Sequence, residues 1–205
     1  MANKIYIIGC GGHARSVADV ILGNNPGAQL VFIDENAAEN ETISGFPVIK
    51  SLEREADCLF VAIGDNQQRR KLAEGKKLIS VISHKADVSP TAIIEEGCFI
   101  GNGAHIGPFA HIGKGTIVNT NSVIEHEVET GSFCHFAPNT TVCGRTIVGS
   151  NVFLGAGATV IDKRRICPDI VIGAGATVVK DIEKNGIYAG VPAVLKKEFN
   201  SNEMV

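Results

Sequence analysis

Apolar residues return at every sixth position from Ala92 onward. Dividing residues 92–181 into fifteen hexads places Ile, Val, Leu or Phe at the third position of fourteen of them, and Thr130 is the exception. An α-helix, with 3.6 residues per turn, cannot keep a six-residue phase over such a distance. The period is typical of a parallel β-helix, in which each hexad forms one flat side. Three sides per coil predict about five coils.

The second position of each hexad is expected to point outward, and positions eighteen residues apart should stack in columns at the strand spacing. Two of these columns are mixed or polar, but the third is mostly apolar. We expect this apolar column to be a subunit interface, because a large exposed apolar stripe marks a contact surface. A prism of this kind predicts a homotrimer, with His135 near the subunit boundary. The apolar column consists of Phe99, Ile117, His135, Phe153 and Val171.

Before Ala92 the pattern alternates between short apolar runs and amphipathic segments. The runs "KIYIIG" (4–9), "QLVFIDE" (29–35) and "DCLFVAIGDN" (57–66) are predicted strands. The segments that begin at "GCGGHARS" (9–16) and "NQQRRKLAE" (66–74) are predicted helices. This order predicts a small parallel sheet of Rossmann-like βαβ type. The chain therefore divides into an α/β domain at 1–85 and a β-helix at 86–205 with a short C-terminal tail.

Composition narrows the possible functions. The 205 residues carry 19 basic and 22 acidic side chains, a formal charge of −3, with no basic run. This charge disfavours a nucleic-acid surface. No apolar stretch is long enough to span a membrane, and the N-terminus lacks the pattern of a signal peptide, so we expect a cytoplasmic protein. The six cysteines include no C-x-x-C pair, which indicates thiols instead of a zinc site or disulfides.

The glycine-rich turn after the first strand is a possible anion site, because backbone N–H groups at a helix start can approach a diphosphate. A plain tight turn would also fit this short motif. Asp34 ends the second strand, where it is placed to accept from a ribose or a base, or to act as a turn residue. Arg69, together with "AIGDN" (62–66), is expected on the far wall of a nucleotide pocket, although a solvated helix face is the alternative. The residues expected around a nucleotide-linked substrate from this half are Gly9, Gly11, Gly12, His13, Asp34, Gly64 and Arg69.

The segment "SVIEHEVETGSFCHF" (122–136) places two histidines and three glutamates within the repeat. Histidine titrates near neutral pH, so His126 is suited to accept a proton from a nucleophile. Either Glu125 or Glu127 is adjacent and able to hold the far ring nitrogen. Gly144, one coil further on, offers a backbone N–H that could stabilise an oxyanion. Two other interpretations remain, a pair of solvated surface histidines and a zinc site, and the histidine spacing disfavours zinc.

Several of these features together resemble a known family. They are the hexad repeat, the "GCGGH" opening (9–13), the segment "NTNSVIEHEVETGSFCHF" (119–136) and the "GVPA" tail (190–193). The chain resembles the left-handed β-helix acetyltransferases that act on nucleotide-linked amino sugars. It is most similar to the UDP-4-amino-sugar N-acetyltransferases of bacillosamine-type pathways. Sialic acid O-acetyltransferases and GDP-perosamine N-acetyltransferases are neighbouring groups.

The resemblance implies a role for each residue of the central segment. His126 would be the general base, Glu127 its orienting acid, His135 a contact of acetyl-CoA, and Asn119 a neighbour of the acceptor amine. Acetyl-CoA would be the acyl donor, and no metal would take part. The residues expected at acetyl-CoA are His135, Gly144, Ala156 and Ala174.

The activity implied is transfer of acetyl to the 4-amino group of a UDP-linked amino-dideoxy sugar for surface glycan synthesis. The sites would lie near the boundaries of a homotrimer. O-acetylation of sialic acid and N-acetylation of a GDP-linked amino sugar are the alternatives within this class. A nucleotide-sugar-binding protein whose prism is purely structural is the alternative outside it.

Overall fold

The computed structural model describes residues 4–52 and 56–199. Its N-terminal part is a five-stranded sheet in the order β3-β4-β2-β1-β5, in which β1 pairs in parallel with β2 and β5. The predicted alternation of strands and helices in this half is confirmed, and a hairpin of β3 and β4 extends the sheet. The elements are β1 (Lys4–Ile8), α1 (Gly12–Asn24), β2 (Gln29–Ile33), β3 (Thr42–Ile43), β4 (Phe46–Ile49), β5 (Leu59–Val61) and α2 (Asn66–Ala73).

The second half is a parallel β-helix of triangular cross-section, and its strands stack in three sheets. Face 1 contains β6 (Val81–Ile82), β9 (Phe99–Ile100), β12 (Ile117–Val118), β15 (His135–Phe136), β18 (Phe153–Leu154) and β21 (Ile170–Ile172). Face 2 contains β7 (Asp87–Val88), β10 (His105–Ile106), β13 (Val123–Ile124), β16 (Thr141–Val142), β19 (Thr159–Val160) and β22 (Thr177–Val178). Face 3 contains β8 (Ile93–Ile94), β11 (His111–Ile112), β14 (Glu129–Thr130), β17 (Ile147–Val148) and β20 (Arg165–Ile166). The hairpin of β23 (Gly186–Ala189) and β24 (Val194–Glu198) extends face 1.

The predicted period and columns are confirmed by the strand register. Residues eighteen apart are paired, as in Ile117 with His135 and His135 with Phe153. Faces 1 and 2 each contribute six strands of the prism and face 3 contributes five, so the described chain forms five complete coils and two sides of a sixth. The count slightly exceeds the predicted five because β6 and β7 precede Ala92 and already belong to the stack.

The third-position side chains fill the interior of the prism. Ile106, Ile124 and Phe136, for example, are fully buried in one continuous apolar cluster. Thr130, the exception in the sequence pattern, is also buried, and its hydroxyl accepts from the backbone N–H of Gly113 at 3.0 Å. A polar residue is tolerated there because its oxygen has a hydrogen-bond partner.

The first two residues of the apolar column on face 1 are covered by the protein's own N-terminal domain. Phe99 and Ile117 are each 1% exposed and pack with Ile7, Ala14 and other residues of the first half. This corrects the expectation that the whole column is a subunit interface. The hexad period identifies which side chains point outward, but it does not identify what covers them. The trimer stays a prediction, and its contacts are expected on other faces.

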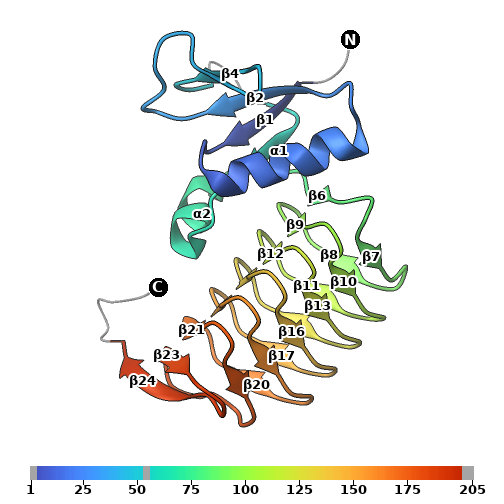
Figure 1. Ribbon diagram of the computed structural model, residues 1–205, viewed down its shortest axis with the longest axis vertical. Helices are drawn as coiled ribbons and strands as arrows, with labels where there is room; N and C mark the ends of the chain where they lie inside the picture. The colour runs from blue at the N-terminus through green and yellow to red at the C-terminus, as the bar shows by residue number, and fades with distance from the viewer. Residues whose placement is uncertain (1–3, 53–55, 200–205) are drawn as a thin grey trace.

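Figure 1 shows α1 and α2 between the N-terminal sheet and the stacked coils. None of the helices in the described part of the chain has the length and apolar character needed to cross a membrane.

Candidate active site

His126 and Glu127 form a hydrogen-bonded pair at the edge of the prism where face 2 meets face 3, here called edge 2–3. The two residues follow β13, and His126 Nδ1 lies 3.0 Å from Glu127 Oε2. Both side chains are about half exposed. Glu125 instead accepts from the backbone N–H of His126 at 3.2 Å. The geometry therefore selects Glu127 as the acid that holds the imidazole ring.

The turn that carries this pair is a regular feature of the prism. Glu127 has a φ of 58°, in the left-handed region, and Phe109, Arg145 and Lys163 at the same place in other coils have φ values of 58–60°. The left-handed backbone at Glu127 is thus required by the edge and is not special to the site. Only the side chains distinguish this coil from its neighbours.

Gly144 lies directly against the far nitrogen of His126. A Cβ atom added at Gly144 would stand 2.5 Å from His126 Nε2, so any side chain there would collide with the ring. Arg145, beside it, approaches the Glu127 carboxylate at 3.8 Å. With Nδ1 donating to Glu127, Nε2 is the nitrogen left to accept a proton, and it lies against Gly144, where no side chain blocks it.

His135 occupies a different place, in the seam between face 1 and the N-terminal domain. Its Nδ1 lies 3.1 Å from the Gly64 carbonyl oxygen, and its Nε2 lies 3.3 Å from Asn119 Nδ2. A carbonyl only accepts, so Nδ1 carries the proton and Nε2 accepts from the Asn119 amide. Burial, and then the nearby Arg69 cation, lower the pKa of His135 to about 4. The ring is neutral at physiological pH.

His13 lies next to His135 in the same seam. The two ring centroids are 6.3 Å apart, and His13 meets Phe99 edge-on at 5.0 Å. His13 Nε2 is buried and has no hydrogen-bond partner among the described residues. Burial, followed by His135 and Arg69, lowers the pKa of His13 to about 3. The seam therefore contains two neutral histidines beside Asn119.

A cavity of about 360 Å³ lies at the carboxyl ends of β1, β2 and β5. Gly9, Asp34 and Ile63 are among the residues that line it. Ligands of open α/β sheets bind at this edge. Asp34 closes a turn by accepting from the backbone N–H of Asn36 at 3.0 Å, so both expectations for this residue, a turn residue and a cavity wall, fit its position.

Helix α1 begins at Gly12, three residues after Gly9, which lines this cavity. Gly11 caps the helix without a side-chain hydrogen bond. A Cβ atom added at Gly11 or Gly12 would meet nothing within 4 Å. The side-chain positions of these two glycines are therefore unobstructed, and the N-terminus of a helix suits an anionic group.

Arg69 is placed differently from the expectation of a pocket wall or a solvated face. Its side chain is 1% exposed, and its nitrogens donate to the Ile63 carbonyl of the first domain and to the Gly115 and Cys134 carbonyls of the prism. Gly64 accepts from it through its backbone carbonyl. Sequence reasoning identified the segment but missed its role, because an arginine on a polar helix gives no sign of burial.

The residues expected at acetyl-CoA lie on two edges of the prism. Gly144 is on edge 2–3 beside His126, whereas Ala156 and Ala174 are exposed on the edge between faces 1 and 2, here called edge 1–2. Asn119 begins the turn after β12 on that same edge 1–2. Edge 2–3 is opposite face 1, on which the N-terminal domain lies. One copy of the chain therefore separates His126 from the cavity, from Asn119 and from the two alanines.

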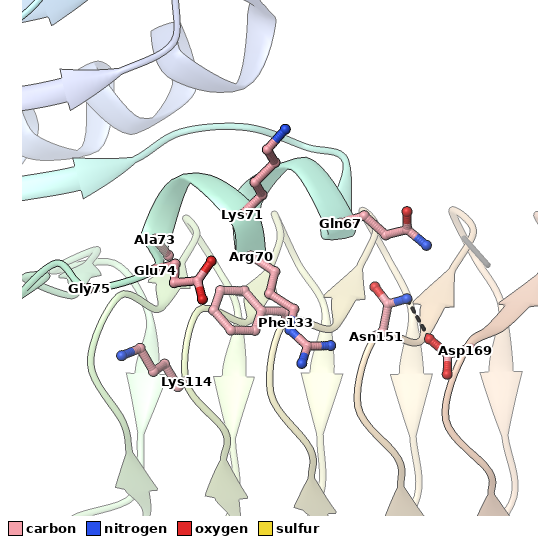
Figure 2. A pocket seen from close by; sticks show the side chains of 10 residues that line it. All are labelled: Gln67, Arg70, Lys71, Ala73, Glu74, Gly75, Lys114, Phe133, Asn151 and Asp169. Atoms are coloured by element: carbon pink, nitrogen blue, oxygen red, sulfur yellow. Dashed lines mark hydrogen bonds between the residues drawn. The ribbon is translucent and has the colours of Figure 1, made fainter.

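A groove of about 790 Å³, larger than this cavity, lies elsewhere, between α2 and the edge where face 3 meets face 1. Arg70, Lys114, Phe133 and Asp169 are among its lining side chains (Figure 2). It contains none of the predicted site residues, so size alone does not identify the active site. Among the residues that the structure describes, no group of three or more His, Cys, Asp or Glu is placed to hold a metal ion.

Comparisons with known proteins agree with this architecture. Residues 4–75 match the model of the PglD N-terminal domain, and residues 91–126 match the bacterial transferase hexapeptide (six repeats). A shorter match, 34% identical over 104 residues, is to uncharacterized protein L142 of Acanthamoeba polyphaga mimivirus, and it spans 21% of that protein's length. The fold and site thus define a hexapeptide-repeat transferase with a PglD-type first domain.

Two solved structures match nearly the whole chain. A histidine-to-alanine variant of GDP-perosamine N-acetyltransferase from Caulobacter crescentus, in complex with CoA and GDP-perosamine, is 33% identical with a TM-score of 0.90, and the match covers 97% of this chain and 99% of that one. The acetyltransferase domain of PglB from Neisseria gonorrhoeae, in complex with acetyl coenzyme A, is 31% identical with a TM-score of 0.88, covering 96% and 100%. The chain belongs to this family of left-handed β-helix sugar N-acetyltransferases.

The two buried histidines predict an acid-sensitive fold. Their pKa values of about 3 and 4 lie below the ordinary 6.5, so between about pH 4 and 6.5 the unfolded chain binds protons that the folded chain does not. The free energy of unfolding should therefore fall as the pH is lowered through this window, by up to about 1.4 kcal/mol per pH unit for each histidine.

Urea unfolding at several pH values measures this slope. His13→Leu should remove one histidine's share of it, whereas His84→Asn, at an exposed histidine, should leave it unchanged. An unaltered slope in His13→Leu would contradict the assignment of a buried neutral His13.

Proposed function

We propose that this protein transfers acetyl from acetyl-CoA to the amino group of a nucleotide-linked amino sugar. The observation that carries the proposal is the His126–Glu127 pair, with Nδ1 and Oε2 3.0 Å apart, in a chain that matches CoA-bound sugar N-acetyltransferases over nearly its whole length. A solvated surface pair would not need a glycine in contact with the outer nitrogen, and Gly144 supplies one.

The chemistry follows from the two nitrogens of His126. The sugar amine attacks the thioester carbonyl, a C–N bond forms, and His126 Nε2 accepts the proton that the amine loses. Glu127 holds the opposite N–H and stabilises the imidazolium that results. The backbone N–H of Gly144 is proposed to donate to the developing oxyanion, a contribution of about 3 kcal/mol in comparable sites. The C–S bond then breaks, and the proton passes from the imidazolium to the CoA thiolate.

Each active site is proposed to form between two copies of the chain. His126 and Gly144 are on edge 2–3, while the cavity, Asn119, Ala156 and Ala174 are on the other side of the same prism. Edge 2–3 of one copy facing edge 1–2 of the next would bring both groups to one site. A closed trimer repeats this contact three times, which supports the predicted homotrimer. In this arrangement His135 lies beside Asn119, and its contact with acetyl-CoA stays a prediction.

The substrate proposed in more detail is a UDP-linked 4-amino-dideoxy sugar for surface glycan synthesis, held in the cavity with its diphosphate at Gly11 and Gly12. N-acetylation of a GDP-linked amino sugar has equal support, because the Caulobacter crescentus relative has GDP-perosamine bound. The family's acetyl-CoA complex supports acetyl-CoA as the donor.

A panel of UDP-, GDP- and CMP-linked amino sugars, assayed for release of free CoA thiol, tests the proposed function. We expect thiol release with at least one amino sugar and mass spectrometry to show the N-acetylated product. Acetylation of a sialic acid hydroxyl alone would support the O-acetyltransferase alternative. A trimeric protein that releases no thiol with any acceptor would support the non-catalytic one.

Substitutions in the pair should affect turnover more than binding. His126→Ala should lower kcat by about 10²–10⁴-fold, the usual share of general-base catalysis, with little change in the KM for acetyl-CoA. Glu127→Gln should lose less, and the double variant should lose less than the product of the two, because the pair acts as a unit.

His111→Ala is the matched control for these substitutions. His111 Nε2 is also paired with a glutamate, Glu95, at 2.9 Å, but it lies in β11 of face 3 and not on edge 2–3. Its kcat should be close to that of the unsubstituted protein. If His126→Ala turned over as fast as His111→Ala, the proposal that His126 is the general base would be wrong.

Mixing two inactive variants tests the composite site. Gly12→Val should block diphosphate binding and His126→Ala should block proton transfer, so each homotrimer is inactive. After subunit exchange, about a quarter of the boundaries in mixed trimers would combine an intact His126 with an intact cavity. Recovery of roughly that fraction of activity is expected, and no recovery despite verified mixing would place both halves of the site in one chain.

A further inference from the structure

A buried arginine and a buried asparagine in α2 together connect the first domain to three coils of the prism. Arg69 is 1% exposed, and its neighbour Asn66 is 4% exposed. Arg69 Nε donates to the Gly115 carbonyl at 2.7 Å, and Nη2 donates to the Cys134 carbonyl at 3.0 Å. Asn66 Nδ2 donates to the Val152 carbonyl at 3.3 Å. These three acceptors belong to successive coils.

The same guanidinium holds the loop that ends at α2. Nη1 donates to the carbonyls of Ile63 and Gly64 at 2.9 and 3.1 Å and to that of Asp65 at 3.3 Å. Nη2 also donates to Asn66 Oδ1 at 2.7 Å. A planar guanidinium reaches acceptors on several sides at once, which an ammonium group cannot do in the same geometry.

This loop is part of the proposed substrate site. Ile63 lines the 360 Å³ cavity, and Gln68 and Leu72, from the helix that carries Arg69, line it too. The Gly64 carbonyl accepts from both Arg69 and His135. His135 in turn accepts from Asn119, whose Oδ1 accepts from the backbone N–H of Thr120 at 2.8 Å. One continuous set of hydrogen bonds therefore runs from the cavity wall to edge 1–2.

Burying a cation among carbonyls is costly, and a shape-filling apolar residue often stabilises a fold equally well. Here an apolar side chain would leave the carbonyls of both domains without their donor, and each buried unsatisfied acceptor is unfavourable. Burial lowers the pKa of Arg69 to about 10, so the group is still a cation at neutral pH. The guanidinium is thus suited to fixing one relative position of the two domains.

We propose that Arg69 and Asn66 are positioning residues that hold the 63–65 loop in register with face 1, so that a sugar bound in the cavity presents its amine beside Asn119 and His135. This inference rests on the proposed function for its kinetic readout. In this proposal Arg69 touches no reacting atom and acts through the Gly64 carbonyl and the 63–65 loop.

Chemical rescue is the decisive experiment. In the full-length protein, Arg69→Ala should lower kcat with the nucleotide sugar by about 10- to 100-fold, because a displacement near 1 Å misaligns the reacting groups. The KM for acetyl-CoA should change less than the KM for the nucleotide sugar, because Arg69 reaches the predicted acetyl-CoA contact, His135, only through the Gly64 carbonyl. Millimolar guanidinium should restore part of the lost turnover, whereas methylammonium, with the same charge but no planar fork, should not.

Arg70→Ala is the matched control, because Arg70 is the adjacent residue of α2 and is exposed. It should keep kcat within about twofold. Wild-type kinetics in folded Arg69→Ala, equal rescue by the two cations, or equal losses toward both substrates would overturn the proposal. If Arg69→Ala does not fold, Asn66→Ala tests the proposal in its place. Asn66→Ala should show a smaller loss of kcat that is again selective for the nucleotide sugar. Wild-type kinetics in Asn66→Ala would overturn the proposal.

Hydrogen exchange separates this inference from the proposed function. Without any substrate, backbone amides of 59–66 should exchange faster in Asn66→Ala than in Arg70→Ala. If no sugar in the panel is acetylated, the proposed function fails, but this measurement still tests whether Arg69 and Asn66 hold the 63–65 loop in place. Unchanged exchange in Asn66→Ala would overturn the proposed positioning role of Arg69 and Asn66 even in an active enzyme.

Discussion

One inward-pointing aliphatic side chain in every six residues is the constraint on which the rest of this protein depends. Each such residue is buried against its counterparts in the coils before and after it, and the cluster is continuous from Cys98 to Ile182. Because the interior is filled by a regular stack, the outward positions form straight columns and the turns form straight edges. The edges can then vary in sequence without loss of the core, and the His126–Glu127 pair occupies one of them.

The junction between the two halves is held by a different combination of interactions. It combines apolar packing of Phe99 and Ile117 with a buried cation whose partners are backbone carbonyls. Packing supplies the driving force but is tolerant of small shifts, whereas the guanidinium requires a defined geometry. The proposed alignment of a nucleotide-linked sugar with a prism edge would benefit from both. The neutral histidines beside it follow from burial and from the nearness of the same cation.

Much of the fold could be predicted from the sequence because its signals are local or periodic. The six-residue period determined the β-helix, its outward-facing columns and the inward-pointing third position of each hexad. The apolar runs and the glycine turn determined the strand–helix order of the first half. The titratable residues inside a monotonous repeat made His126 the candidate base, and stacking at eighteen residues placed Gly144 against it.

What only the tertiary structure decided is how the two halves meet. The sequence could not show that Phe99 and Ile117 of the apolar column are covered by the protein's own first domain, or that Arg69 is buried. Nor could it choose Glu127 over Glu125 by geometry, or place His126 on the edge opposite the cavity. These features depend on contacts between residues far apart in the chain. Periodicity reports which way a side chain points, but its partner depends on the three-dimensional arrangement of whole domains.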